Sequence, residues 1–536
     1  MPEPSSASTP HERESVKTAT IGLIISFVVV LVFRGFFLET FHIPTGSMAP
    51  TLMGQHMRFH SPDTGVDWAV NPWPDARSGV RVTDPSTNRP RIEANPRLRA
   101  GDRIAIIKYN PLYHPKRWDV VVIKWPSSPR ENYIKRLIGM PGERVWLVDG
   151  DAFIADADAA TDDWSAWRIA RKPERVQNAL WWPLFSSERA PIDPVFDGRA
   201  WTGPWRGQGW NTEGRIYTWT PGSSSGAGGG GGSGGGGAAT LTWDLDNWPI
   251  TDWQPYNDVP RWVFPRFPTA DIRAHAAVEP EREGAGFAFE LRARGHVFRA
   301  SHDGGSRAAI EMRPDTGAAA WTTLAEAAAP ALPAGRATTI EVWHVDQSLQ
   351  LRIGGKAVVR ADYDWDPMQR LEHATGLDAA AIAELLENGR NNPLANPAIY
   401  RAPLALGWTF TNTGALTLQR VGLDRDVSYV PTWYRSGEPA GMPALGTHPA
   451  NVATLGEGHY YLLGDNSANS TDSRLIDTVD PWVLRFIDED LPLGVIPREF
   501  MMGRAFICFW PATQSANLGN ARFPFVPDTG RMRFID

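Results

Sequence analysis

A long run of apolar residues close to the N-terminus predicts a membrane-spanning helix. Residues 18–38 contain a single charged side chain, Arg34, and residues 1–17 before them form a short polar N-terminus. Such a run gives about 31 Å of helix, enough to cross the hydrocarbon core of a bilayer, and Arg34 can reach the lipid headgroups. No A-x-A cleavage site follows the run, which favours an uncleaved anchor over a cleaved signal. The flanking Lys and Arg residues do not determine its orientation.

After the anchor, short β-branched runs predict strands. The runs RIAIIKY (103–109), WDVVVIKW (118–125) and YIKRLIG (133–139) are separated by turn residues, and a Pro-Gly turn follows the third. Short strands and turns return between residues 456 and 511. We therefore expect an all-β domain in two parts, 39–148 and 456–511, with 512–536 as a C-terminal tail.

Residues 149–455 separate these two parts and form a large insertion. Residues 222–237 are almost pure Gly and Ser, which predicts a flexible loop. From about 240 to 423, alternating segments recur at short intervals, and the Gly354-Gly355 pair is typical of a hairpin turn, so we expect a jelly-roll-like β-sandwich. One helix is predicted to begin at Asp378. A flexible loop and a separate core also predict that the rest of the chain keeps measurable activity when residues of about 240–423 are removed.

Composition narrows the function classes. A chain of 536 residues is too long for one ordinary core. The net charge of −7 provides no global basic field, so no nucleic-acid partner is expected. Cys508 is the only cysteine, which excludes an intrachain disulfide and a CxxC zinc site, and its apolar neighbours predict a core position. We expect no metal and no other cofactor.

Two short segments carry candidate chemistry. The segment HIPTGSMAPTL (42–52) places Ser47 on a turn constrained by prolines, although a serine beside glycine is common in ordinary turns. In YIKRLIG, Lys135 shares one strand face with Tyr133 and Leu137, where loss of water would lower its pKa from about 10.4 towards the range of a general base. The alternative is a strand-edge lysine that faces solvent.

The third segment is GDNSANSTDSR (464–474), which is dense in small polar residues. Asp465, Asp472 and Arg474 are able to form ion pairs there. The alternative is a surface loop shaped by Asx turns.

Together with the anchor and the Gly101-Asp102 pair, these segments resemble, in order, the motifs of bacterial signal peptidase I. The resemblance covers about residues 20–52, 101–145 and 456–511. It implies a serine endopeptidase that removes N-terminal signal peptides from exported preproteins, with Ser47 as nucleophile and Lys135 as general base. It also implies a single-pass protein of the cell inner (plasma) membrane, with the lipid bilayer and preprotein signal peptides as partners and the catalytic domain on the extracytoplasmic side.

The resemblance also implies roles for other residues. Thr45 would complete the oxyanion hole beside the Ser47 backbone N–H, Ser470 would orient the Lys135 amine, and an Asp472–Arg474 salt bridge would shape its surroundings. Pockets for small P1 and P3 side chains would be lined by Phe41, Ile43, Pro44, Met48, Leu52, Tyr133 and Ile134. Arg425-Asp426 resembles the family's RDVYY segment.

The sequence departs from the family's motifs at two places. Ser467 and Ala468 stand where the family usually has Arg-Asp, for which we expect altered loop packing rather than lost activity. Thr45 replaces the serine of Gram-negative members and keeps the hydroxyl.

Three other interpretations compete with this one. The segment 222–226 matches G-x-S-x-G but has no preceding strand. Residues 149–163 are acidic but lack the Gly and Glu of a calcium loop, so a solvated acidic loop is expected. Finally, the chain could be a membrane-tethered carbohydrate- or protein-binding module acting through the sandwich, whose pattern resembles laminin-G or concanavalin-like jelly rolls. A peptidase with such a sandwich satisfies both interpretations.

Overall fold

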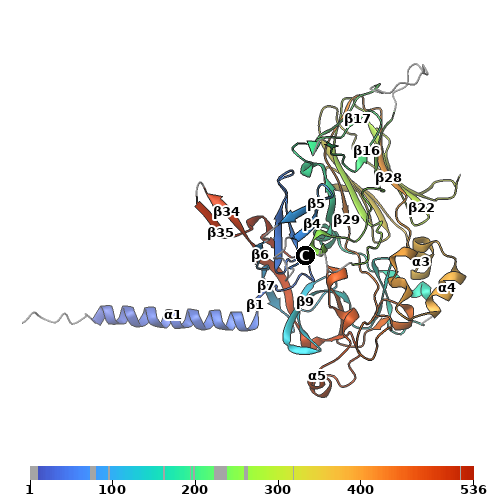
Figure 1. Cartoon of the computed structure of the whole chain (residues 1–536). Helices are drawn as coiled ribbons and strands as arrows, with labels where there is room; N and C mark the ends of the chain where they lie inside the picture. Colours follow the sequence, from blue (N-terminus) through green and yellow to red (C-terminus); the bar gives the residue numbers. More distant parts are fainter. Residues whose placement is uncertain are drawn as a thin grey trace, which may run out of the picture.

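One long helix stands apart from a mainly β body in the computed structural model (Figure 1). The structure describes residues 10–72, 80–93, 97–160, 163–193, 195–196, 199–222, 238–258, 264–317, 319–518 and 521–535. Helix α1 (Pro10–Phe36) contains a segment, Lys17–Phe36, that is long and apolar enough to cross a membrane, with a mean hydropathy of 2.3. The chain leaves the helix two residues before the predicted end at residue 38, because strand β1 begins at Leu38.

The first large sheet is assembled from segments at both ends of the chain. Its strand order is β1-β7-β33-β8-β9-β31-β32, and β36 pairs with β33. The strands are β1 (Leu38–His42), β7 (Arg103–Lys108), β8 (Val120–Trp125), β9 (Ser128–Gly139), β31 (His459–Leu463), β32 (Ile496–Pro497), β33 (Met501–Trp510) and β36 (Arg533–Phe534). The predicted all-β architecture is thus confirmed, and strand β9 lies beside a strand more than 300 positions later in the sequence.

A second sheet, in the order β12-β11-β10-β30, lies against the first. Its strands are β10 (Glu143–Val148), β11 (Asp151–Asp156), β12 (Arg168–Ile169) and β30 (Ala453–Thr454). The predicted boundary between residues 148 and 149 therefore divides the β10–β11 hairpin, and we place the start of the insertion after helix α2 (Glu174–Leu180). The solvated acidic loop expected at 149–163 was wrong in part, because Asp151 is only 3% exposed.

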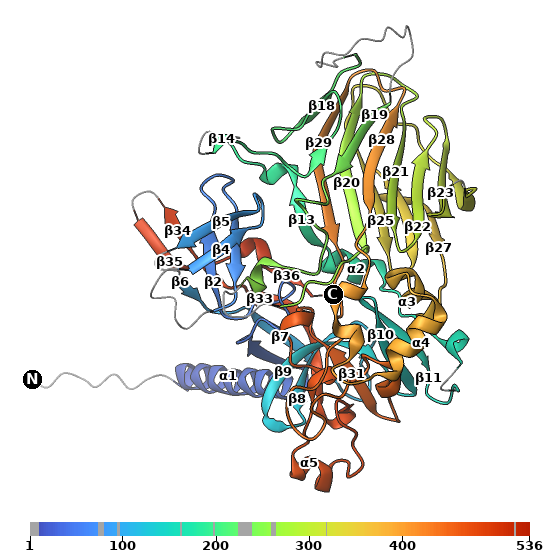
Figure 2. The same ribbon diagram turned by 45° about the vertical axis from the view of Figure 1, so that its right-hand side comes forward.

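The insertion contains a sandwich of two antiparallel sheets that share one core (Figure 2). One sheet runs β17-β18-β29-β20-β25-β26-β27 with β13 beside β29, and the other runs β16-β19-β28-β21-β22-β23-β24. The strands of the first sheet are β13 (Trp182–Ser186), β17 (Trp210–Asn211), β18 (Tyr217–Trp219), β20 (Ile272–Pro280), β25 (Thr338–Val345), β26 (Ser348–Ile353), β27 (Lys356–Asp362) and β29 (Leu416–Arg425). Those of the second are β16 (Trp205–Arg206), β19 (Ala239–Trp243), β21 (Gly286–Ala293), β22 (His296–His302), β23 (Arg307–Pro314), β24 (Thr322–Ala328) and β28 (Ala405–Thr411).

The sandwich begins earlier in the chain than its alternating pattern predicts. Trp201, Trp205 and Trp219 are buried in its core although they precede residue 240. This tryptophan-rich stretch has no period-two alternation, so the sequence pattern did not reveal its strands. Residues 223–237 of the Gly/Ser-rich loop, and most of the 222–226 motif, lie outside the described residues.

Helices and smaller sheets complete the molecule. The predicted helix is confirmed as α4 (Ala379–Glu387), whose N-cap Asp378 accepts a hydrogen bond from the Ala381 N–H. It follows α3 (Pro367–Thr375), which was not predicted. The remaining elements are β2 (His56–His60), β3 (Asp67–Val70), β4 (Val80–Asp84), β5 (Arg89–Glu93), β6 (Arg97–Arg99), β14 (Val195–Phe196), β15 (Arg199–Ala200) and α5 (Pro481–Phe486).

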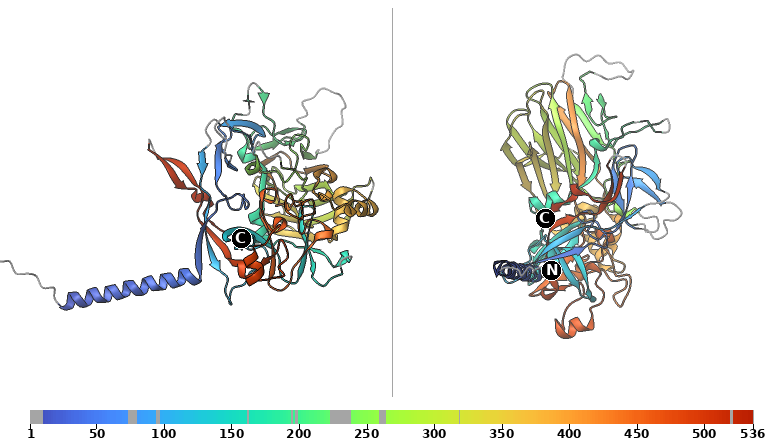
Figure 3. Two further views of the ribbon diagram at one scale, coloured as in Figure 1. Left: turned by 60° about the horizontal axis from the view of Figure 1, so that its bottom comes forward. Right: turned by 90° about the vertical axis from the view of Figure 1, so that its left-hand side faces the viewer.

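The C-terminal segment is not a simple tail. Strands β34 (Thr513–Leu518) and β35 (Ala521–Pro527) form a hairpin, and β36 then returns to pair with β33. Cys508 on β33 is buried as predicted. Figure 3 shows the hairpin projecting on the same side of the body as α1. The hairpin and the returning strand place the end of the chain against the first sheet.

Candidate active site

Ser47 lies on a tightly held turn, which we call the serine turn (residues 43–55). The turn joins β1 to β2, and its two ends meet where the Gln55 N–H donates to the Pro44 carbonyl at 3.1 Å. Ser47 is 8% exposed. The following Met48 and Leu52 are fully buried, so the apolar residues after the serine anchor the turn in the core.

Lys135 reaches Ser47 from strand β9. Its Nζ lies 2.8 Å from Ser47 Oγ and also donates to the Ile134 carbonyl at 3.0 Å. Burial removes water from the ammonium and lowers the pKa of Lys135 to about 8, although Asp472 and Asp465 oppose this shift. An amine with this pKa is neutral in part of the molecules near neutral pH and can accept a proton at that distance.

Asp472 and Arg474 form the predicted salt bridge. The Arg474 guanidinium contacts both carboxylate oxygens of Asp472 at 2.8 Å, and both side chains are buried. Burial alone would raise the pKa of Asp472, but Arg474 holds it below its usual value. The carboxylate therefore stays ionised beside the lysine, where its field raises the Lys135 pKa and limits the effect of burial.

Asp465 has a partner that sequence reasoning missed. It forms a bidentate pair with Arg136 at 2.8 Å for each contact, and it also accepts a hydrogen bond from the Thr51 hydroxyl. One carboxylate thus joins the serine turn to the lysine strand. Arg136, which follows Lys135 in YIKRLIG, was the signal that the sequence offered, but its position alone could not identify Asp465 as its partner.

Asp102 secures the other side of the serine turn. Its backbone N–H donates to the Met53 carbonyl and its side chain accepts from the Met53 N–H, both at 2.8 Å. A Cβ added at Gly101 would lie 1.9 Å from the Ile43 carbonyl oxygen, so only glycine fits this crossing. These contacts explain why Gly101 and Asp102 stand directly before strand β7.

Ser470 and Ser467 differ in their contacts. Among the described residues, the buried Ser470 hydroxyl has no hydrogen-bond partner, so the expected bond to the Lys135 amine is absent and the orienting role remains a prediction. Ser467, which replaces the family's arginine, accepts hydrogen bonds from Arg474 at 2.8 Å and from the Val430 N–H at 2.9 Å. The replacement thus produces specific polar packing in this loop.

The two expected oxyanion-hole donors, the Ser47 N–H and the Thr45 hydroxyl, belong to the serine turn and are available to bind an oxyanion. In the described part of the chain, neither the Ser47 N–H nor the exposed Thr45 hydroxyl makes a hydrogen bond. Donors without an internal partner can stabilise an oxyanion at little reorganisation cost. Their role remains a prediction.

The predicted pocket residues are only partly together. Ile43, Met48, Leu52 and Ile134 share one apolar cluster, with Phe41 packed against it. Tyr133 instead stacks on Trp125 at a centroid distance of 4.3 Å, and Pro44 is exposed. A separate cavity of about 760 Å³ is lined by residues 467–471, which include Ser470, by residues 430–436 and by Phe264, Pro265 and Phe267, and none of the predicted pocket residues lines it. The subsites remain predictions.

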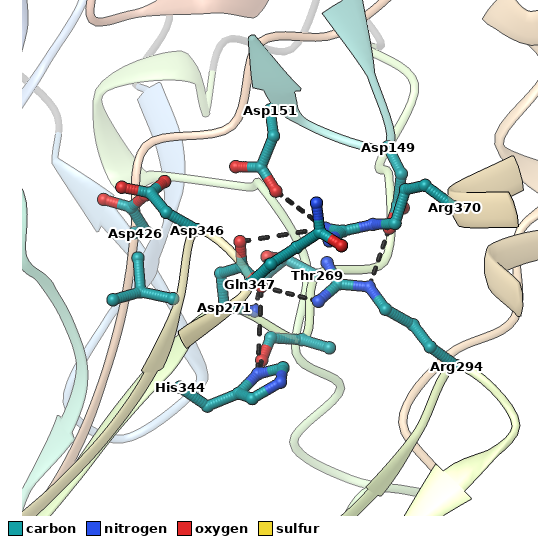
Figure 4. Close-up of polar contacts among 12 residues, drawn as sticks. Asp149, Asp151, Thr269, Asp271, Arg294, His344, Asp346, Gln347, Arg370 and Asp426 are labelled. Carbon is teal, nitrogen blue, oxygen red and sulfur yellow. Dashed lines mark hydrogen bonds and ion pairs between the residues drawn. The ribbon is translucent and has the colours of Figure 1, made fainter. Parts of the chain in front are cut away.

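A buried ionic cluster lies between the sandwich and the β10–β11 hairpin (Figure 4). One oxygen from each of four aspartates falls within 4.8 Å of the others: Asp151, Asp271, Asp346 and Asp426. Such a group could hold a metal, but three buried cations already supply countercharge there. They are Lys172, Arg294 and Arg370. We assign the cluster to joining the two domains, and the sequence offered no pattern that would unite these distant residues.

The geometry combines a β-rich body, an N-terminal apolar helix and a buried serine beside a lysine. Comparison with known proteins agrees: residues 80–179 and 432–510 match the family described as signal peptidase, peptidase S26. Signal peptidase I of Pseudomonas fluorescens is 37% identical over 117 residues, and that of Pseudomonas aeruginosa is 34% identical over 117 residues. In both cases the match covers 22% of this chain and 30% of the relative. The predicted resemblance to signal peptidase I is confirmed for this part, whereas Ser47 lies outside the residues matched by the family.

Solved structures resemble the chain over the insertion at low sequence identity. A carbohydrate-binding module, CBM66 from Bacillus subtilis, is 7% identical, with a TM-score of 0.22, covering 41% of this chain and 95% of that one. A Bacillus subtilis protein of unknown function with a galectin-like fold is 10% identical, with a TM-score of 0.21, covering 41% and 89%. Because these scores are low, the description of the sandwich rests on its own two sheets and shared core.

Proposed function

We propose that the protein is a membrane-anchored serine endopeptidase that removes signal peptides from exported preproteins, with Ser47 as nucleophile and Lys135 as general base. The observation that carries the proposal is the 2.8 Å approach of the two side chains in a buried site, with a lysine pKa of about 8. A neutral amine takes the proton from the serine hydroxyl, which then attacks the scissile carbonyl. The Ser47 N–H and the Thr45 hydroxyl receive the oxyanion.

The substrate would bind as an extended strand with small P1 and P3 side chains beside the serine turn. Strand β1 begins two residues after helix α1 ends, so Ser47 lies within a short chain distance of the helix. This position suits a substrate whose own apolar segment is in the bilayer. We place α1 in the inner membrane and the β body on the extracytoplasmic side, following the resemblance.

The test is cleavage of a preprotein by the detergent-solubilised full chain. Wild type is expected to release the signal peptide. Ser47→Ala is expected to reduce the rate by at least about 10³-fold, because alanine has no hydroxyl to attack the scissile carbonyl. Ser348→Ala is the control, since Ser348 is also buried but donates to the Val345 carbonyl in the sandwich. Cleavage by Ser47→Ala at the wild-type rate would refute the proposal.

A further inference from the structure

A short segment of the insertion lies directly against the serine turn. We call residues 254–257 the buttress segment; it contains the 3₁₀ turn Pro255–Asn257 and falls between β19 and β20 of the sandwich. Gln254, Tyr256 and Asn257 are all nearly buried, at 3%, 2% and 7% exposed. The chain therefore leaves one sheet of the sandwich, contacts the serine turn, and returns to the other sheet.

The Tyr256 ring packs on the glycine that precedes the nucleophile. A Cβ added at Gly46 would lie 2.0 Å from Tyr256 Cε1, so the ring occupies the space that any side chain at position 46 would need. The ring also packs with Ala49 and Met53 from the same turn. Its hydroxyl donates to the Gln55 carbonyl at 2.9 Å, at the end of the turn.

Asn257 reaches the same turn through Asn466. The two amides pair reciprocally, with Asn257 Nδ2 donating to Asn466 Oδ1 at 2.7 Å and Asn466 Nδ2 donating to Asn257 Oδ1 at 2.9 Å. Gln254 donates to the same Asn466 oxygen. Asn466 Nδ2 then donates to the Gly46 carbonyl, and the Asn466 N–H donates to the Ser47 carbonyl, both at 3.0 Å.

These contacts saturate the Asn466 side chain, because its oxygen accepts two hydrogen bonds and its amino group donates two. A fully paired buried amide has one favourable orientation. The insertion therefore determines where Asn466 holds the two backbone carbonyls on either side of the Ser47 Cα.

We propose that Tyr256 and Asn257 are positioning residues for the nucleophile, so that the inserted sandwich is part of the catalytic apparatus. This inference extends the proposed function, and its kinetic predictions rest on that function. A displacement of a reacting atom by about 1 Å can cost about 100-fold in rate. Loss of the Tyr256 ring frees the turn to move Ser47 away from Lys135 while leaving the lysine's charged neighbours in place.

The experiment compares Tyr256→Ala, Tyr256→Phe and Asn257→Ala in the detergent-solubilised full chain. Tyr256→Ala and Asn257→Ala are expected to lower kcat by about 10- to 100-fold with KM within about threefold of wild type. Tyr256→Phe keeps the ring and is expected to retain most of kcat.

Tyr400 provides the matched control. It is also a buried tyrosine of the insertion whose hydroxyl donates to a backbone carbonyl, that of Leu394 at 3.0 Å, and it packs on Phe267 rather than on the serine turn. Tyr400→Ala is expected to lower the melting temperature while leaving kcat of the folded protein near wild type. An equal loss of kcat in Tyr400→Ala would overturn the inference, because it would indicate general destabilisation.

Amide hydrogen exchange gives a readout that does not depend on cleavage. The Ala49 and Leu52 N–H groups donate within the serine turn, to Gly46 at 3.0 Å and to Met48 at 2.9 Å. Their exchange is expected to accelerate at least tenfold in Tyr256→Ala and Asn257→Ala, but not in Tyr400→Ala. Unchanged exchange would overturn the inference even if the peptidase proposal holds, whereas absent cleavage by wild type with accelerated exchange would refute only the proposed function.

Discussion

At the scale of single residues, the site depends on charges that are buried and paired. The Asp465 and Arg136 side chains are about 1% and 0% exposed; Arg136 follows Lys135 in the sequence, and Asp465 contacts Thr51 of the serine turn. Removing one partner of a buried ion pair leaves the other without compensation, which is costly. The same carboxylate also raises the pKa of Lys135 by its field. Stability and base strength are therefore coupled at Asp465.

Asp465→Asn is expected to have two separable effects. Loss of the pair with Arg136 should lower the free energy of unfolding by about 3–5 kcal/mol, measured by denaturant titration. Loss of the negative charge should also lower the Lys135 pKa, so the midpoint of the pH–rate profile should move to lower pH. Asp490→Asn, at an exposed position, is the control and should change neither quantity. A midpoint that stays fixed or rises would contradict this account of the lysine's surroundings.

At the scale of elements, the sequence predicted the strands better than their partners. The β-branched runs became β7, β8 and β9, and Asp378 caps α4 as its position indicated. The serine and lysine segments were recognised from motifs, and their side chains do meet. The contacts of Asn466 with Asn257 and of Asp465 with Arg136 could not be predicted, because they join residues 209 and 329 positions apart without a local pattern. The C-terminal segment was missed for the same reason, since β36 gains its structure by pairing with β33.

At the scale of the whole molecule, the sandwich is joined to the β body rather than merely tethered. The buttress segment contacts the serine turn, and the ionic cluster connects Asp151 on β11 with Asp271, Asp346 and Asp426 of the insertion. These contacts contradict the premise, taken from the glycine-rich stretch, that the insertion is independent. A domain attached by buried polar contacts contributes to the stability of its neighbour.

Removal of residues 240–423 is therefore expected to abolish cleavage, in contrast to the expectation from sequence. The deletion removes Tyr256 and Asn257 together with Asp271, Asp346, Arg294 and Arg370. Preprotein cleavage and thermal unfolding of the anchored deletion protein would be measured beside wild type, and the rate should fall below about 1% because the serine turn loses its support. Wild-type cleavage by the deletion protein would show that the sandwich is dispensable.

The most direct test of the central claim is single-turnover cleavage of an Ala-x-Ala substrate from pH 5 to 10 by wild type, Lys135→Arg and Lys135→Met. The lysine accepts a proton only when neutral, so the wild-type rate should fall about tenfold per pH unit below the lysine pKa of about 8 and level off above it. Both variants should show no cleavage above that of Ser47→Ala, because guanidinium stays protonated and methionine is not a base. Lys124→Met, on the neighbouring strand β8, should keep the wild-type profile. Near-normal turnover by folded Lys135→Arg would contradict the account and remove Lys135 from the mechanism.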